Sequence, residues 1–374
     1  MTLRIAILGH FPVDAPPTGG VQSVIANLRD ELACREDVQL HLVQNRRGIP
    51  VGTFQREGWT EHNLDARETR FIPNMMRTPS LLRPLLMELD PDVISSHHPE
   101  YSVTALKMGF PVLHTIHGFP IDEFWLRRGF FTRTAILETV WQEHQMLRRI
   151  QHIAAISKIV IRRYRHRTRA HFHRINNPVA PLFFTSAPDP TPGRLLLVGN
   201  MTPIKGIDVA IETIQRLLPN YPHLQLTIVG RNSDQAYGDR IRTLAEPLGS
   251  AIQFLDPVDQ SEIKRLLGKS QALLLTSNHE HAPMIVSEAM AAGRPVVATQ
   301  VGALADMITT GVTGYLAPVG DAKALASSLA RLLDDPAHAS QLGANAARVA
   351  REQYHPTTVA DGYLRALRTA MAQA

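Results

Sequence analysis

The sequence predicts an α/β fold with parallel, doubly wound sheets, because short apolar runs alternate with helical patterns along nearly the whole chain. The run Leu3 to Leu8 is apolar and ends at Gly9, as a buried parallel strand does. In the next segment Ile25, Leu28 and Leu32 stand three and four residues apart, which places them on one helical face. Repeated strand–helix units of this kind are typical of parallel sheets covered by helices.

Further strands are predicted where short apolar runs stand between helical patterns. In the first half of the chain they are Val38 to Val43, Val93 to Ser96, Val112 to Ile116 and Ile153 to Ile156. In the second half they are Arg194 to Val198, Gln225 to Val229, Ile252 to Leu255, Ala272 to Leu275 and Pro295 to Ala298. The tail from Thr357 to Ala374 has a helical pattern and no strand after it.

A proline-rich segment separates two such alternations. The prolines between Pro178 and Gly193 are too dense for a helix or a central strand. We therefore expect a first domain over residues 1–180, a linker over 181–193, a second domain over 194–355 and a C-terminal helix over 356–374. That helix is expected to pack back towards the first domain. Ligands bind at the carboxyl ends of strands in such sheets, so a cleft between the domains is the expected site.

The composition narrows the class of protein. Of the 374 residues, 44% are hydrophobic and 20% are charged, which is ordinary globular usage. Cys34 is the only cysteine, so neither an intramolecular disulfide nor a thiolate metal cluster can form. The start, Met1 to Gly9, is too short for a signal peptide, and no stretch approaches the roughly 20 apolar residues of a spanning helix. We expect a cytoplasmic protein, at most peripheral to a membrane.

The clearest indication of chemistry lies in the second domain. Glu280 follows a predicted strand, and a loop ending at Pro283 leads into a helix that begins near Met284. The first N–H groups of a helix, here at Met284 and Ile285, lack helical partners and attract anions such as a diphosphate. Glu280 can accept hydrogen bonds from sugar hydroxyls, and Glu288, one turn into the helix, from a ribose. Taken alone, such a glutamate pair is more often two solvated helix-end residues.

A second loop of the same domain suits a phosphate. Lys205 and Gly206 open a helix after the predicted strand that ends before Gly199. Lysine supplies a point charge beside a phosphate, and glycine lets the backbone approach it. The alternative is an exposed surface lysine.

The first domain offers two weaker candidates. Gly19 and Gly20 follow the first strand, and His117 stands at the end of a later one. Taken alone, the glycine pair is more often an ordinary tight turn. A lone histidine is often a structural hydrogen-bonding residue.

Together these segments resemble the retaining GT-B glycosyltransferases of family four, also called glycosyl transferases group 1. The pattern is Glu280, seven residues, Glu288 and then Ala-Met-Ala-Ala-Gly-Arg-Pro-Val-Val-Ala over residues 289–298. The resemblance spans nearly the whole chain and is stronger in the second domain. It implies two Rossmann-like domains facing an interdomain cleft. It also implies transfer of a sugar from a nucleotide-sugar, most often UDP- or GDP-linked, to a hydroxyl acceptor, with retention of configuration and without metal or other cofactor.

The resemblance assigns roles to the residues above. The predicted catalytic residues are His117, Lys205 and Glu280. The predicted donor-binding residues are Gly19, Gly20, Gly199, Asn200, Lys205, Gly206, Arg231, Pro283, Met284, Ile285 and Glu288. The acceptor, which is a glycan, a lipid-linked sugar or a small molecule, is expected to contact first-domain loops such as Phe119 to Phe131.

The sequence departs from the family pattern in the donor site. The family usually has an arginine where this chain has Asn200, so one cation for the diphosphate is missing. We predict that Arg231, which follows Gly230 after the next strand, supplies part of that charge. Asp256 replaces a frequent glycine in the loop expected near the base of the nucleotide. The sequence therefore does not decide which nucleotide the donor carries.

Two motifs imitate metal sites. Asp90 and Asp92 form a D-x-D pattern, but they precede a strand instead of following one. His97 and His98 are adjacent, so their side chains diverge in an extended backbone, and no third ligand stands at metal spacing. We expect no catalytic metal.

A basic stretch marks the end of the first domain. No Asp or Glu occurs from His144 to Pro188. The basic residues of this stretch are Arg148, Arg149, Lys158, Arg162, Arg163, Arg165, Arg167, Arg169 and Arg174. A solvated outer face and adhesion to an anionic membrane or a phosphorylated lipid acceptor are equally good interpretations. No aromatic interleaving or known motif supports binding to nucleic acid.

Two other functions remain open from the sequence. One is an epimerase or a phosphorylase on the same architecture, and a phosphorylase would need a lysine-held pyridoxal cofactor. The other is a catalytically silent sugar-binding subunit. The presence of Lys205, Glu280 and Glu288 favours the enzyme.

Overall fold

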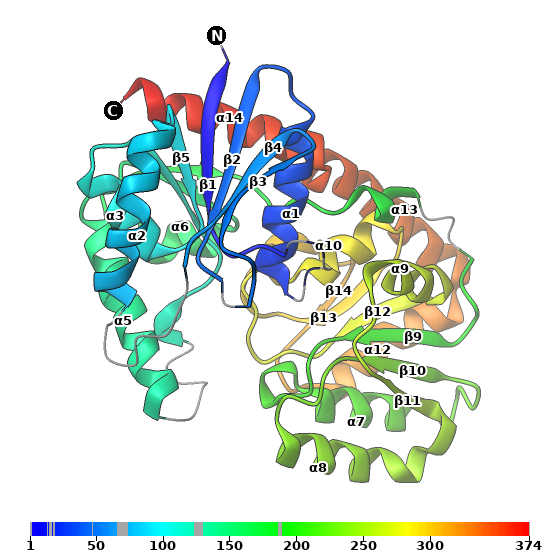
Figure 1. Cartoon of the computed structure of the whole chain (residues 1–374). Helices are drawn as coiled ribbons and strands as arrows, with labels where there is room; N and C mark the ends of the chain where they lie inside the picture. The colour runs from blue at the N-terminus through cyan, green and yellow to red at the C-terminus, as the bar shows by residue number, and fades with distance from the viewer. Residues whose placement is uncertain are drawn as a thin grey trace. The chain divides into compact units, whose positions relative to one another are not determined.

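The computed structural model describes the chain except for residues 1, 13, 15, 16, 18, 47, 66–73, 123–129, 186–188 and 374. The chain divides into two compact units (Figure 1). Unit 1 comprises Met1–Pro178 and Pro356–Ala374, and unit 2 comprises Val179–His355. Residues 181–193 therefore belong to unit 2. Asp189 N and Thr191 N donate to carbonyls of residues 268 and 269 in the same unit.

Unit 1 is built on an eight-stranded sheet in the order β3-β4-β2-β1-β5-β6-β7-β8. The strands are β1 (Leu3–Leu8), β2 (Val38–Gln44), β3 (Gly52–Arg56), β4 (Trp59–Asn63), β5 (Val93–Ser96), β6 (Val112–Ile116), β7 (His152–Ala155) and β8 (His171–Arg174). All neighbours are parallel except β3 and β4, which form an antiparallel hairpin. Because β1 lies between β2 and β5, it is buried on both faces, which explains its continuous apolar run.

Two helices from opposite ends of the chain share one core in unit 1. Helix α1 (Gly20–Ala33) packs on α14 (Pro356–Ala372), and both contribute to a cluster that includes Ile25, Leu28 and Leu367. The other helices are α2 (Asn74–Leu89), α3 (Pro99–Lys107), α5 (Phe130–Leu147) and α6 (Lys158–Tyr164). Helix α3 packs between α2 and α5 (Figure 1). The C-terminal helix is thus part of the first unit.

Unit 2 is built on six parallel strands in the order β11-β10-β9-β12-β13-β14. The strands are β9 (Arg194–Val198), β10 (Gln225–Val229), β11 (Ile252–Leu255), β12 (Ala272–Leu275), β13 (Val296–Thr299) and β14 (Gly314–Ala317). The α-helices are α7 (Ile207–Leu217), α8 (Gln235–Ala245), α9 (Gln260–Lys269), α10 (Met284–Ala291), α11 (Leu304–Met307), α12 (Ala322–Asp334) and α13 (Pro336–Tyr354). Short 3-10 turns are η1 (Pro181–Thr185), η2 (Pro203–Lys205) and η3 (Glu246–Ala251).

The doubly wound α/β fold is confirmed, and each predicted strand occurs with its ends displaced by at most one residue. The strands that the sequence analysis missed are β3, β4, β8 and β14. The first three carry many polar side chains and lie at or next to a sheet edge, so they lack the apolar run of a central strand. No helix in the described part of the chain is long and apolar enough to cross a bilayer.

Candidate active site

The strand order of unit 2 changes direction between β9 and β12. At such a switch point the loops that follow the two strands diverge to opposite faces and leave a crevice in which doubly wound proteins bind ligands. Here the two loops are held together by Asn278, whose backbone N donates to Ile204 O at 2.7 Å. Its Nδ2 also donates to Pro203 O at 2.8 Å. The loops therefore form one rigid unit around Lys205 and Glu280.

Lys205 and Glu280 form an ion pair at this switch point. Lys205 Nζ lies 2.5 Å from Glu280 Oε1, and Ser277 Oγ donates to the same oxygen at 2.8 Å. The Glu280 side chain is 9% exposed, whereas that of Lys205 is 24% exposed. An ammonium carries three N–H groups and can therefore bind further acceptors while it keeps the pair. The structure thus brings together a cation and a carboxylate that stand 75 residues apart.

Glycine allows the close approach of the two loops. Gly206 has a left-handed backbone with φ of 56°, and a Cβ there would lie 2.3 Å from Thr276 O. Thr276 Oγ1 in turn donates to Gly206 O at 2.8 Å. A Cβ on Gly199 would lie 3.2 Å from Cδ of Lys205, so the lysine stem passes directly over that glycine.

Gly302 is a site residue whose role the sequence analysis did not recognise. Its φ is 57°, and a Cβ there would lie 1.6 Å from Glu280 O. The next residue, Ala303, donates its N–H to His281 O at 3.2 Å. The segment before α11 therefore supports the backbone of Glu280 from behind. A glycine ahead of a helix was visible in the sequence, but the contact that requires it was not.

Helix α10 begins at Met284, as predicted, with Pro283 as its N-cap residue. No side chain caps it, and within the described residues the N–H groups of Met284 and Ile285 have no hydrogen-bond acceptor. Such N–H groups carry partial positive charge and bind anions. Four residues along the helix, burial raises the pKa of Glu288 to about 7. Its carboxyl group has no hydrogen-bond partner in the part of the chain that the structure describes, so it remains available to ligand hydroxyls.

Asn200 and Arg231 lie side by side, which is necessary if Arg231 is to supply the charge that Asn200 lacks. Arg231 N donates to Asn200 Oδ1 at 3.3 Å, and Met201 N donates to Arg231 O at 2.8 Å. Both side chains are exposed, and the role of Arg231 stays a prediction. The exposed Asp256 follows β11.

The strand order of unit 1 changes direction between β1 and β5, and histidines follow this point. His97 comes directly after β5, and its Nδ1 lies 2.8 Å from Nε2 of His117, which follows β6. The two rings stack with centroids 5.1 Å apart. They open on a cavity of about 430 Å³, lined by His10, Val21, Gln22, His97, His98, Pro99, His114, Thr115, Ile116, His117, Gly118, Phe119, Pro120, Ile136, Thr139 and Glu143. Sequence reasoning proposed His117 but missed His97 as its partner.

Burial keeps this histidine cluster neutral. It lowers the pKa of His117 to about 4 and those of His98 and His114 to about 3, and that of His97 falls well below its usual value. A neutral imidazole has one donor and one acceptor nitrogen. In the pair of His97 and His117 one ring therefore donates and the other accepts, which fixes the tautomer of both. His117 is suited to a hydrogen bond with a hydroxyl, not to carrying positive charge.

The predicted glycine loop lies at the start of α1. Gly19 is the N-cap residue and Gly20 is the first helical residue, and both are exposed. Gly19 has an extended backbone with open space around it, so nothing in the described structure demands glycine there. Val21 and Gln22 line the same cavity as His117. Thr18 and residues 123–129 of the predicted acceptor loop lie outside the described residues.

The two sequences that imitate metal motifs have other contacts. Asp92 accepts hydrogen bonds from the backbone N and Nη2 of Arg4 at 2.8 and 2.9 Å, so its carboxylate is engaged. His98 diverges from His97 and lies against the ring of His10, with centroids 4.7 Å apart. Both motifs therefore contribute to packing in unit 1.

Comparison with protein families identifies the chain. The model described as Glycosyltransferase Family 4 matches residues 18–181, and the model described as Glycosyl transferases group 1 matches residues 181–349. The chain belongs to this glycosyltransferase family. The chain is 34% identical over 172 residues to glycogen synthase of Mycobacterium tuberculosis, which covers 44% of this chain and 40% of that protein. It is 27% identical over 364 residues to phosphatidyl-myo-inositol mannosyltransferase of Mycobacterium leprae, which covers 88% and 87%.

The fold is that of GT-B proteins over the full length. Sucrose-phosphate synthase from Thermosynechococcus elongatus superposes with a TM-score of 0.81 and 20% identity, covering 100% of both chains. The Anabaena HepE protein, solved with UDP and glucose, superposes with a TM-score of 0.71 and 16% identity over 98% of this chain and all of the other. The chain spans about 40% of the length of several curated relatives, including the glycogen synthase above.

Proposed function

We propose that this protein is a retaining, metal-independent hexosyltransferase that uses a UDP- or GDP-sugar as donor. The observation that carries the proposal is the Lys205–Glu280 pair at the β9–β12 switch point. It is supported by the uncapped first turn of α10, which follows in the same loop. The acceptor is a hydroxyl of a glycan, a lipid-linked sugar or a small molecule.

The roles follow from the chemistry of each group. Lys205 and the N–H groups of Met284 and Ile285 stabilise the charge that develops on the departing diphosphate. Glu280 and His117 hold hydroxyls of the donor sugar, and Glu288 accepts hydrogen bonds from the ribose. The bond from the anomeric carbon to the phosphate oxygen breaks while the bond to the acceptor oxygen forms on the same face. The acceptor proton passes to the departing phosphate oxygen, so the protein contributes orientation and charge stabilisation.

The test is a panel of nucleotide-sugars assayed for transfer and for slow hydrolysis. One donor should be consumed, and the product should keep the anomeric configuration of the donor when it is examined by NMR. Lys205→Ala and Glu280→Gln should strongly slow both reactions, whereas Lys323→Ala, which changes an exposed lysine of α12, should not. Donor binding without turnover would identify a silent subunit. An absorbance band of bound pyridoxal would identify a phosphorylase, and recovery of an epimerised donor an epimerase.

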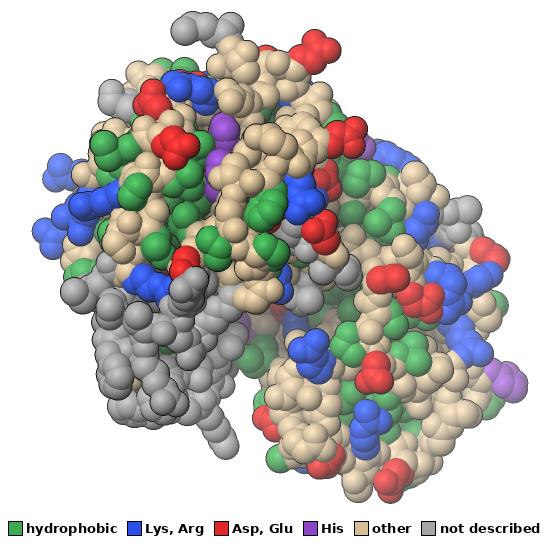
Figure 2. Space-filling model, viewed as in Figure 1, with side chains coloured by type: hydrophobic (Ala, Val, Ile, Leu, Met, Phe, Trp, Pro, Cys, Tyr) green, Lys and Arg blue, Asp and Glu red, His purple; other side chains and the backbone are tan. Residues whose placement is uncertain are grey.

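The basic stretch bears on where the acceptor is located. Its members are exposed except for Arg163, which binds Asp122 at 2.8 Å. In the view of Figure 2 Lys and Arg side chains also gather at the left edge of unit 1. The relative from Mycobacterium leprae is named a phosphatidyl-myo-inositol mannosyltransferase, which suggests a lipid acceptor. We propose that the stretch binds anionic membranes. The protein should sediment with phosphatidylglycerol vesicles at low salt and not with neutral ones, and failure to do so contradicts the proposal.

A further inference from the structure

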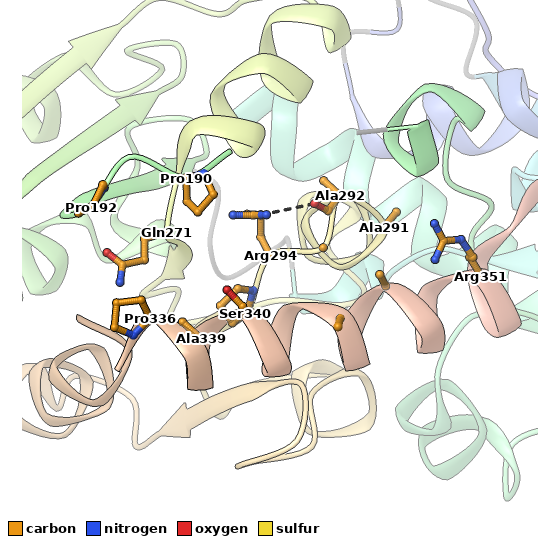
Figure 3. Close-up of a pocket in the computed structure, with 14 residues that line it drawn as sticks. Pro190, Pro192, Gln271, Ala291, Ala292, Arg294, Pro336, Ala339, Ser340 and Arg351 are labelled. Carbon is orange, nitrogen blue, oxygen red and sulfur yellow. Dashed lines mark hydrogen bonds between the residues drawn. The ribbon is translucent and has the colours of Figure 1, made fainter. Parts of the chain in front are cut away.

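A cavity of about 380 Å³ lies beside the C-terminal end of α10, within unit 2 (Figure 3). The proposed donor site lies at the other end of this helix, about 12 Å away at the usual rise per residue. The cavity is bounded by α13. This helix passes close to the end of α10, and Gly343 allows the approach because a Cβ there would lie 2.2 Å from Gly293 O. The residues that line the cavity do not include Lys205 or Glu280, so it is separate from that ion pair.

The floor of the cavity carries a buried arginine without an acidic partner. Arg294 is 4% exposed and lines the cavity, and burial lowers its pKa to about 10. Its Nη1 donates to Ser270 O at 3.1 Å, and its Nε lies 3.4 Å from Ala292 O. A guanidinium has five N–H groups, so three remain without an acceptor among the described residues. Burial of a charge is costly unless the charge is paired.

The walls of the cavity provide more cationic and apolar surface but no acidic group. Its lining residues are Pro190, Pro192, Gln271, Ala291, Ala292, Gly293, Arg294, Pro295, Pro336, Ala339, Ser340, Ala344, Ala347 and Arg351. Figure 3 shows Arg294 between Pro190 and Ala292, and Arg351 at one end of the set of labelled residues that line the cavity. Arg351 is exposed and forms no hydrogen bond or ion pair with any residue that the structure describes. Two arginines thus face a cavity that offers them no counter-charge.

A capping role accounts for only part of this arrangement. Arg294 follows the last turn of α10, and its bond to Ala292 O places positive charge at the negative end of that helix. Backbone carbonyls do not neutralise a guanidinium, however, and three of its N–H groups are left over. A planar fork of N–H groups matches the oxygens of a phosphate. The volume exceeds that of inorganic phosphate and falls in the range of small-molecule pockets.

We propose that this cavity is a second ligand site, which binds a small organic phosphate monoester through Arg294. Arg351 stands at one end and adds attraction for the dianion. The apolar alanine and proline walls contact the organic part of the ligand. This site is independent of the proposed sugar transfer, so its test does not use activity.

The experiment is calorimetric titration of the full chain with glycerol 3-phosphate, inorganic phosphate and glycerol. Glycerol 3-phosphate should bind with one site, inorganic phosphate more weakly, and glycerol not at all. Arg294→Lys keeps the charge but loses the fork and should weaken binding about tenfold, since a charge-assisted bidentate contact is lost. Arg351→Ala should weaken it about threefold by removing a nearby charge. Ser340→Glu, at an exposed wall position, should abolish binding by repulsion without disturbing the fold.

Two controls separate this site from the donor site. Arg348 is an exposed arginine of α13 that pairs with Glu352 and does not line the cavity, so Arg348→Ala should leave binding unchanged. Lys205→Ala should also leave it unchanged. Binding that survives Arg294→Lys, Arg351→Ala and Ser340→Glu, or that disappears in Lys205→Ala, overturns the proposal. Equal affinity for inorganic phosphate and glycerol 3-phosphate overturns the assignment to a monoester. If Arg294→Lys fails to fold, the other two cavity variants decide.

Discussion

Units 1 and 2 both carry polar side chains where their strand order reverses, but the chemistry differs. In unit 2 a lysine and a glutamate meet as an ion pair, Lys205 with Glu280. In unit 1 two neutral imidazoles meet, His97 with His117, and burial holds both uncharged. A pair that includes a cation suits a charged leaving group, because the ammonium of Lys205 can stabilise developing negative charge. A neutral pair suits hydroxyl groups, because it orients a donor and an acceptor without attracting anions.

The largest expected effect comes from breaking the ion pair. Lys205→Ala and Glu280→Gln should each lower kcat about 10³-fold, in the range found when an electrostatic contact to the transition state is removed. The double variant should be little worse than either single one, because residues that act as a unit have non-additive effects. Steady-state kinetics with the identified donor measures this. Effects that multiply in the double variant, or losses below tenfold, would show that the two side chains act separately.

Substitution in the neutral pair of His97 and His117 should lower kcat less than substitution in the ion pair. His97 does not need to touch the substrate, and we expect it to act as a positioning residue that fixes the tautomer of His117. His97→Ala should lower kcat about 30-fold with little change in the donor KM, and His97→Gln, which retains hydrogen-bonding groups, should restore part of it. The ¹⁵N chemical shifts of His117 should report a mixed tautomer in the alanine variant.

The neighbouring histidine provides the matched control for this prediction. His98 is half-buried in the same cluster, and its ring lies against those of His10 and Tyr101, whereas the hydrogen bond to His117 comes from His97. His98→Ala should therefore leave the ¹⁵N shifts of His117 unchanged. Equal effects of the His97 and His98 substitutions on kcat and on these shifts would mean that packing, not tautomer control, explains the loss.

Glu288 extends the comparison to pH, because it is the acidic group of the proposed donor site that burial leaves near neutrality. Its pKa is raised to about 7, so the carboxylate form falls from about nine-tenths at pH 8 to about one-tenth at pH 6. If ribose binds the carboxylate, kcat/KM for the donor should fall about tenfold over that range. In the unit 1 cluster, His98, His114 and His117 titrate below this window and do not contribute.

The substitution Glu288→Gln identifies the titrating group. It should lower kcat/KM at pH 8 and remove the dependence between pH 8 and pH 6, because glutamine does not ionise. An acidic limb that persists in the glutamine variant would assign the dependence to another residue. A profile of kcat/KM against pH for both proteins is sufficient.

The candidate site of unit 2 was easier to predict from the sequence than that of unit 1. In unit 2, Glu280, Glu288 and the start of α10 lie within one short segment, so their spacing in the sequence is enough to predict that they lie close together. In unit 1, His97 and His117 are separated by 20 residues and meet only because β5 and β6 are neighbours. Periodicity does not reveal such a contact.

Other features depended on tertiary structure in the same way. Gly302 was visible as a glycine, but its need arises from the carbonyl of Glu280 lying where a side chain would be. Strands β3 and β4 were missed because their side chains are largely polar, although their hairpin turn at Gly58 has a positive φ of 77°. The cavity at Arg294 forms from segments that are distant in sequence.

The smallest expected effect concerns Arg231, which we predict to replace the cation that Asn200 lacks. Because its side chain is exposed, its attraction for a diphosphate is screened by salt, unlike that of the partly buried Lys205. Arg231→Ala should raise the donor KM about threefold at low ionic strength, and the difference should vanish near 0.5 M salt. Arg216→Ala, an exposed arginine of α7 that pairs with Glu212, should show no change at either ionic strength. Unchanged KM in Arg231→Ala at low salt would leave Lys205 and the helix N-terminus as the whole grip on the diphosphate.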